Sequence, residues 1–154
     1  MTRLLLAVLL VASPRVAVQE LLNLEGTWRG SCADCAPNAM PAGFSRTLVI
    51  RVSPSEIAIR NDGFPADVYR LDGTETALAD GRTATASVEA GTVVLTTVRT
   101  RARSRDEVYQ TLMRHVYRVS GNTLTVERSA RGIHPNEPPS ERWVRIGTVM
   151  YQRD

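Results

Sequence analysis

The stretch that decides the fold of this chain reads Glu107-Val108-Tyr109-Gln110-Thr111-Leu112-Met113-Arg114-His115-Val116-Tyr117-Arg118-Val119, then Ser120-Gly121-Asn122, then Thr123-Leu124-Thr125-Val126-Glu127-Arg128. It is rich in β-branched and aromatic residues, and apolar and polar side chains alternate along its second part, as they do in half-buried strands. Glycine and asparagine both tolerate the positive φ of a tight hairpin turn. The stretch therefore predicts two antiparallel strands joined at Gly121-Asn122.

Outward from this hairpin, the same pattern repeats along the chain after residue 24. Short runs rich in β-branched residues alternate with Gly, Asn, Asp and Pro, and no helical period appears. Turn dipeptides such as Asp72-Gly73 and Ala90-Gly91 separate the runs. The strands that we expect lie near Thr27–Ser31, Ser45–Val52, Glu56–Arg60, Asp67–Leu71, Thr83–Glu89, Thr92–Arg101, Glu107–Val119, Thr123–Arg128 and Arg142–Arg153.

A meander of eight or nine antiparallel strands buries its edges best by closing into a barrel or by folding into a sandwich. We expect an all-β, up-and-down antiparallel barrel. Two proline-containing segments, Cys32–Gly43 and Gly132–Ser140, interrupt the meander and are expected to be loops at the barrel mouths. Leu21–Leu24 is expected to form a short helical turn before the first strand.

The chain has 154 residues, of which 43% are hydrophobic, and this suits one folded domain. Residues 1–19 resemble an export signal, because Arg3 supplies a positive start and Leu4–Ala12 is an apolar run too short to span a bilayer. Ala17 is the candidate for the last signal residue, although Arg15 departs from the usual small residue at its position. We therefore expect an exported protein, periplasmic or extracellular, whose domain occupies residues 20–154.

Charge argues against nucleic-acid binding. Every basic residue is an arginine, and the formal charge of the whole chain is +3. Without residues 1–19 the chain keeps 17 basic and 16 acidic residues, so the exported domain is nearly neutral. No other segment is long and apolar enough for a membrane helix, so we expect no integral membrane segment in the mature chain.

Several segments carry a resemblance to a known family. Gly26-Thr27-Trp28 resembles the Gly-x-Trp start of lipocalin-like barrels. The order of Tyr69–Glu75, Thr92–Arg99, Val116–Val119 and Asn122–Arg128 resembles a group of uncharacterised secreted bacterial lipocalin-like (calycin-type) β-barrel domains. The resemblance covers about Leu24 to Asp154 and implies the fold and export, but no shared activity. It also implies that Trp28 closes one barrel end against an arginine of the last strand, with Arg153 as the first candidate and Arg145 as the alternative.

Cys32 and Cys35 form the one CxxC motif of the chain. In an oxidising compartment, two cysteines without a third favour a structural disulfide, which we expect here. A thiol-redox role would need a lowered thiolate pKa, and the prolines after the motif indicate a loop rather than the helix that usually supplies it. A zinc site would need further ligands, and only His115 and His134 are available, so we expect no metal.

Arg99, Arg101, Arg103 and Arg105 alternate with small residues, so a strand would place all four guanidinium groups on one face. Such a face could bind an anion such as phosphate or a lipid headgroup. The alternative interpretation is a solvated hairpin tip whose charge Asp106 and Glu107 balance.

The strand that follows carries the candidate ligand site. Tyr109, Met113, His115 and Tyr117 share one of its faces, and this face mixes apolar surface with a few polar tips, as small-molecule sites do. If the face points into an open barrel, these four residues are the predicted ligand contacts. If the barrel is filled, they are core instead. One histidine is too little to predict haem, so we expect no cofactor.

No spacing in the chain matches a nucleophile elbow or a paired-histidine metal helix, so we expect no catalytic residues and no enzymatic activity. The leading hypothesis is an exported barrel that binds a small apolar or amphipathic molecule. Two alternatives stay open: a small secreted enzyme or thiol-redox protein that uses the CxxC motif or His115, and a structural or partner-binding module with a filled core.

Overall fold

The computed structural model describes residues 21–31, 40–41, 43–89, 91–102, 107–133 and 142–154. The structure of this part of the chain is almost entirely β. Its ten strands are β1 (Gly26–Ser31), β2 (Thr47–Val52), β3 (Glu56–Asn61), β4 (Asp67–Arg70), β5 (Thr76–Ala77), β6 (Thr83–Glu89), β7 (Thr92–Ala102), β8 (Val108–Ser120), β9 (Thr123–Ile133) and β10 (Val144–Arg153).

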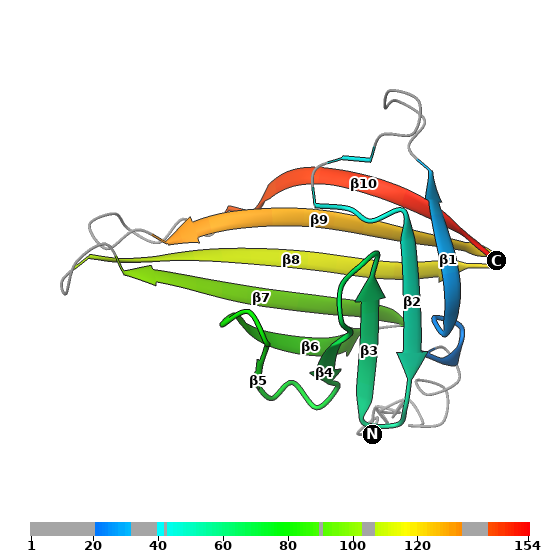
Figure 1. The fold of residues 1–154 in the computed structure, drawn as a ribbon, viewed down its shortest axis with the longest axis horizontal. Helices are drawn as coiled ribbons and strands as arrows, with labels where there is room; N and C mark the ends of the chain where they lie inside the picture. The colour runs from blue at the N-terminus through cyan, green and yellow to red at the C-terminus, as the bar shows by residue number, and fades with distance from the viewer. Residues whose placement is uncertain (1–20, 32–39, 42, 90, 103–106, 134–141) are drawn as a thin grey trace, which may run out of the picture.

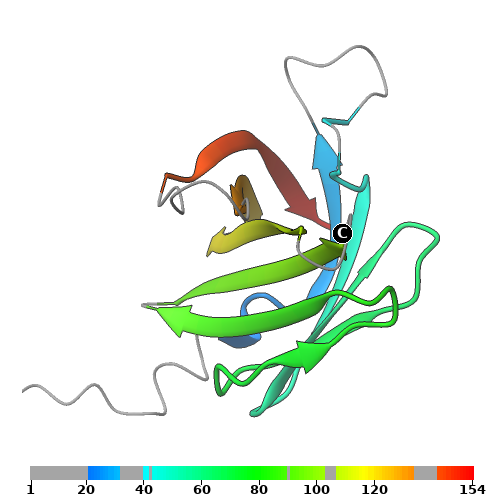
Figure 2. The ribbon, with the colours of Figure 1, turned by 90° about the vertical axis from the view of Figure 1, so that its left-hand side faces the viewer.

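All ten strands belong to one antiparallel sheet with the order β4-β3-β2-β1-β10-β9-β8-β7-β6-β5. Neighbours in this order are consecutive in sequence except for β1 and β10, which join the two ends of the chain. The sheet curls so that β4 approaches β5 and β6 without forming a ladder with β6, which leaves a nearly closed barrel (Figures 1 and 2). The predicted fold class is confirmed. The predicted number of strands is slightly low, because a strand as short as β5 produces no visible alternation.

The strands are unequal in length, and this shapes the barrel. β1, β2 and β3 have 6 residues each, whereas β7 and β9 have 11 and β8 has 13. In Figure 1 the long strands run across the view, nearly perpendicular to β1–β3, and one end of β7 and β8 projects past the short strands. β9 continues to Ile133, so the beginning of the predicted loop Gly132–Ser140 is strand. Among the described residues, no strand lies opposite this projecting end (Figure 1).

Period-two alternation builds the core, because one face of each strand points into the barrel. In β3, for example, Ile57 and Ile59 are buried while Glu56 and Arg60 are exposed. Ile50, Val93, Leu95, Leu124 and Val149 fill the same interior from other strands. The aliphatic residues dominate because the chain has so few aromatics.

Trp28 closes one end of the barrel. Its side chain is fully buried, and its indole Nε1 donates a hydrogen bond of 2.9 Å to the carbonyl of Leu24 in the helical turn before β1. The Arg153 guanidinium lies over the indole ring, 4.4 Å from its centroid, and donates to the carbonyls of Glu25 and Asn23. The two residues face each other across the β1–β10 ladder.

Arg145, the alternative partner of Trp28, lies elsewhere and donates to the Thr148 hydroxyl. Three sequence predictions fall outside the residues that the structure describes: the export signal at residues 1–19, the Cys32–Cys35 disulfide, and the arginines at 103 and 105. Among the described residues, no helix is long and apolar enough to cross a membrane.

Candidate ligand-binding cavity

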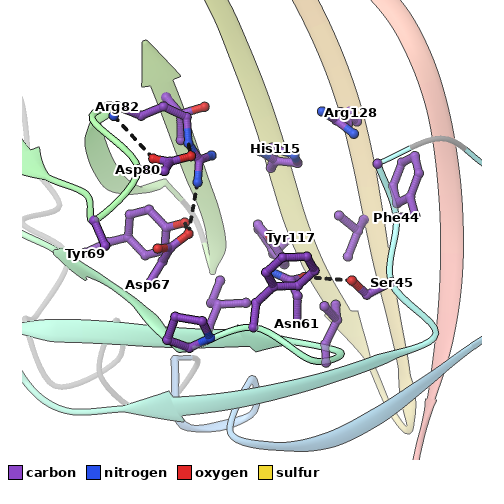
Figure 3. Close-up of a pocket in the computed structure, with 18 of the residues that line it drawn as sticks. Phe44, Ser45, Asn61, Asp67, Tyr69, Asp80, Arg82, His115, Tyr117 and Arg128 are labelled. Atoms are coloured by element: carbon purple, nitrogen blue, oxygen red, sulfur yellow. Dashed lines mark hydrogen bonds and ion pairs between the residues drawn. The ribbon is translucent and has the colours of Figure 1, made fainter. Parts of the chain in front are cut away.

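A cavity of about 490 Å³ lies inside the barrel, with His115 and Tyr117 in its wall (Figure 3). Trp28 is not among its lining residues, and the cavity extends from Leu48, the ladder partner of Trp28, toward His115 and Arg128. It reaches the molecular surface, since the exposed residues Phe64 and Asp80 are part of its wall. The connections between β1 and β2, β3 and β4, and β5 and β6 surround it. Its lining residues come from seven strands and these connections: Gly43, Phe44, Ser45, Leu48, Ile59, Asn61, Phe64, Pro65, Asp67, Tyr69, Ala79, Asp80, Arg82, Thr97, His115, Tyr117, Val126, Arg128 and Tyr151.

The deep wall of the cavity is mainly apolar. Leu48, Ile59 and Val126 are buried core residues whose inward side chains line it. Tyr117 and Tyr151 contribute ring surface, and burial raises the pKa of both phenols. The phenols therefore stay protonated at any physiological pH and can offer hydrogen bonds without charge.

A chain of ion pairs lines one side of the open end. Arg82 lies 2.6 Å from Asp80 and 3.3 Å from Asp67, and Arg99 lies 3.2 Å from Asp80. Burial alone would raise the pKa of Asp80, but hydrogen bonds from Arg82 and Arg99 and the charge of Arg82 outweigh it and hold the pKa below its usual value. Asp67 begins β4 and Arg82 precedes β6, so this ion pair bridges the gap where the barrel lacks a backbone ladder.

His115 projects into the middle of the cavity. Burial, together with the positive charges of Arg128 and Arg82, lowers the pKa of its imidazole to about 4. The ring is therefore neutral at pH 7, with one nitrogen that can donate and one that can accept a hydrogen bond. No described residue forms a hydrogen bond with it, and its nearest ring neighbour is Tyr117, with 6.4 Å between the centroids. The imidazole is thus positioned to bond to whatever enters the cavity.

Arg128 faces His115 directly across the β8–β9 ladder. Burial lowers the pKa of its guanidinium, although the group stays protonated. The backbone at Gly43 covers this guanidinium so closely that a Cβ on Gly43 would lie 1.3 Å from Nη1 of Arg128, and Gly43 also has a φ of +80°. The positive φ favours glycine at this position, and a Cβ there would also force the Arg128 guanidinium to move.

The residues next to Gly43 fasten the same segment over the barrel. The ring of Phe44 lies against Gly147, where a Cβ would come within 3.4 Å of it. The hydroxyl of Tyr151 donates a hydrogen bond of 2.9 Å to the carbonyl of Ser45, and the hydroxyl of Ser45 lies 3.2 Å from the side-chain oxygen of Asn61. These contacts tie the connection between β1 and β2 to the cavity wall.

The structure brings together two of the four residues predicted to contact a ligand. His115 and Tyr117 line the cavity, whereas Tyr109 and Met113 are not among its lining residues. Met113 pairs with Thr97 at the edge of the cavity, and Tyr109 pairs with Arg101 on the projecting part of the sheet. Strand alternation places the four residues on one face, but along the strand they extend beyond the cavity, so only two of them line it.

Sequence reasoning missed the charged members of the site. The signal for Arg128 was present: a two-residue turn at Gly121-Asn122 pairs Ser120 with Thr123, and this register places Arg128 opposite His115. No comparable signal existed for Asp67, Asp80 and Arg82, which meet only because the barrel curls. Among the described residues, no group of three or more His, Cys, Asp or Glu side chains could hold a metal ion.

Comparisons of this chain with models of known protein families, with curated proteins and with solved structures find no match. The chemistry of the cavity is therefore the basis for an interpretation of its function.

Proposed function

We propose that this protein is an exported, lipocalin-like carrier that holds one small amphipathic molecule in the barrel. The observation that carries the proposal is the cavity of about 490 Å³, with an apolar deep wall and polar groups toward its open end. Small-molecule sites in proteins are typically concave, largely preformed and mostly apolar, with a few placed polar groups. The apolar part of the ligand would lie against Leu48, Ile59 and Val126, and His115 would orient its polar part.

The size and form of the cavity support a ligand. Small-molecule sites usually have volumes of roughly 300–1,000 Å³, and the cavity of about 490 Å³ lies within this range. It also opens to the molecular surface, so a molecule can enter it. The neutral imidazole of His115 also lines the cavity without a hydrogen bond to a described residue, so its nitrogens are available to a ligand.

Two further observations support the finer parts of the proposal. The stacking of Arg153 on Trp28 is the arrangement that the lipocalin-like resemblance implies for the closed end of the barrel. The apolar run Leu4–Ala12 after Arg3 supports export.

The test is a titration with the uncharged apolar dye Nile red, together with native mass spectrometry of the complex. We expect saturable binding of one dye molecule per chain in the wild type. Tyr117→Ala removes ring surface from the deep wall and should weaken dye binding about tenfold. Val116→Ala is the matched control, because Val116 is also buried and adjacent but is not among the cavity-lining residues.

Equal dye affinities in wild type and Tyr117→Ala would contradict the proposal, because the dye would then bind outside the cavity. Absence of dye binding would also contradict it. A His115→Phe variant keeps the ring volume and so guards against loss of the fold in Tyr117→Ala. It should retain the dye but lose affinity for dodecanol, whose hydroxyl can bond to the imidazole.

A further inference from the structure

The arginine row on β7 lies on the same face of the sheet as the cavity. Thr97 lines the cavity, and Arg99 and Arg101 follow it at intervals of two residues, so their side chains share its face. Across the β7–β8 ladder, Arg99 pairs with Thr111 and Arg101 with Tyr109. Arg99 and Arg101 therefore lie on the continuation of the inner face of the barrel and not on its outer face.

These arginines lie in front of the open end of the cavity. At the rise of a β-strand, Arg99 lies about 7 Å and Arg101 about 13 Å beyond Thr97. Both residues are exposed, and they lie on the part of β7 that projects past the described short strands β1–β3 (Figure 1). A molecule that extends out of the cavity along β7 would pass over them.

Charge at this rim is positive. Arg82 and Arg99 share Asp80, and Arg82 also contacts Asp67. Arg101 forms no ion pair with any described residue. Counting only Arg82, Arg99 and Arg101 with Asp67 and Asp80, all of them described residues, three guanidinium groups lie beside two carboxylates at this side of the rim. Guanidinium groups bind carboxylate and phosphate oxygens with paired hydrogen bonds, which suits them to an anionic head group.

Resting on the carrier function proposed above, we propose that the rim formed by Arg99 and Arg101 binds the anionic head of an amphipathic ligand whose apolar body fills the cavity. Polarity along the cavity sets this orientation. The deep wall is apolar, and the charged lining residues that the structure describes lie toward the open end. The ligand class is thus a carboxylate- or phosphate-bearing amphipath with its head outward.

The experiment measures displacement of Nile red by dodecyl phosphate, dodecanol and dodecyltrimethylammonium, each below its micelle concentration. Dodecyl phosphate should bind most tightly to the wild type, and its advantage over dodecanol should shrink as salt is added. In the double variant R99Q/R101Q this advantage should fall about 3- to 20-fold, the effect of two exposed charge contacts. R101Q alone should lose part of it, with no ion pair to a described residue disturbed.

R114Q is the matched control, since Arg114 is an arginine of the same hairpin that points to the opposite face of β8. It should leave the advantage of dodecyl phosphate within twofold of the wild type. Equal affinities for dodecyl phosphate and dodecanol in the wild type would overturn the head-group inference while the carrier function stands. Failure of both Nile red and dodecanol to bind would refute the carrier function itself. Displacement by inorganic phosphate as strong as that by dodecyl phosphate would identify a free anion as the ligand and overturn the proposal.

Discussion

The two ends of the barrel differ in how completely their polar side chains are hydrogen-bonded within the protein. At the closed end, Trp28 has no exposed surface, its indole N–H bonds to the carbonyl of Leu24, and Arg153 covers the ring while it donates to two more carbonyls. The indole Nε1 of Trp28 and both Nη atoms of Arg153 therefore have hydrogen-bond partners within the protein. Such an arrangement adds stability and leaves nothing for a ligand to bind.

At the open end the balance is reversed. The cavity is empty of side chains, and the His115 imidazole has no hydrogen bond with a described residue. Ion pairs such as Arg82–Asp80 lie partly in solvent, where they contribute little to stability. The same sheet thus places a fully bonded, buried side chain at Trp28 and leaves the polar groups that a ligand could bind around His115. Three experiments test this division.

The largest effect is expected at the closed end. Trp28→Ala should lower the free energy of unfolding by about 3–5 kcal/mol, because it leaves a large cavity and removes the ring on which the Arg153 guanidinium stacks. Urea denaturation measures the loss. The matched control is Trp143→Ala, since Trp143 is only half-buried and packs beside Arg131 with 5.2 Å between guanidinium and ring; it should cost about 1 kcal/mol. Similar losses in the two variants would show that Trp28 is not a special plug.

A smaller effect on the free energy of unfolding is expected when the pH is lowered, and it comes from His115 in the cavity. The folded-state pKa of His115 is about 4, below the ordinary value near 6.5. Between pH 4 and pH 6.5 the imidazole is therefore protonated in the unfolded chain but neutral in the folded protein. Stability should therefore be complete above pH 6.5, fall as pH is lowered toward 4, and lose at most about 3 kcal/mol from this group.

Chemical denaturation at several pH values, in wild type and in His115→Gln, measures this contribution. Other titrating groups contribute equally to both proteins, so the difference between the two curves isolates His115. A difference that stays constant from pH 7 to pH 4 would mean that the imidazole titrates normally and that the cavity is more hydrated than its burial implies.

The smallest effect concerns the segment over the cavity. Tyr151→Phe removes the hydrogen bond of 2.9 Å to the Ser45 carbonyl and should cost about 1 kcal/mol. Tyr117→Phe is the control, because the Tyr117 hydroxyl has no hydrogen bond with a described residue and its loss should cost close to nothing. Hydrogen exchange of the amides near Ser45 should speed up in Tyr151→Phe alone. An equal loss in the free energy of unfolding in the two variants would mean that the hydrogen bond from Tyr151 to Ser45 does not stabilise the segment over the cavity.

Local pattern was sufficient for the strands and their turns. The predicted run Thr83–Glu89 agrees with β6 residue for residue, and most other strands differ by one or two residues at their ends. Alternation also predicted that His115 and Tyr117 share one face, and the structure shows that this face lines the cavity. The turn at Gly121-Asn122 fixes the register that sets Arg128 opposite His115. These features depend on neighbours in sequence, or on one tight turn, so the amino-acid order carries them directly.

Local pattern thus carries the antiparallel meander and tells which side chains share a strand face, whereas the pairing of Trp28 with Arg153 was expected from the lipocalin-like resemblance. The place and depth of the cavity depend on the tertiary structure. Met113 and Tyr109 share the face of His115, yet they lie outside the cavity because β8 is longer than the strands that would have to wall it. Asp67 and Arg82 meet because the sheet curls until β4 approaches β6. Alternation specifies the face of a strand, whereas depth and closure depend on strands that are distant in sequence, and no local pattern encodes those distances.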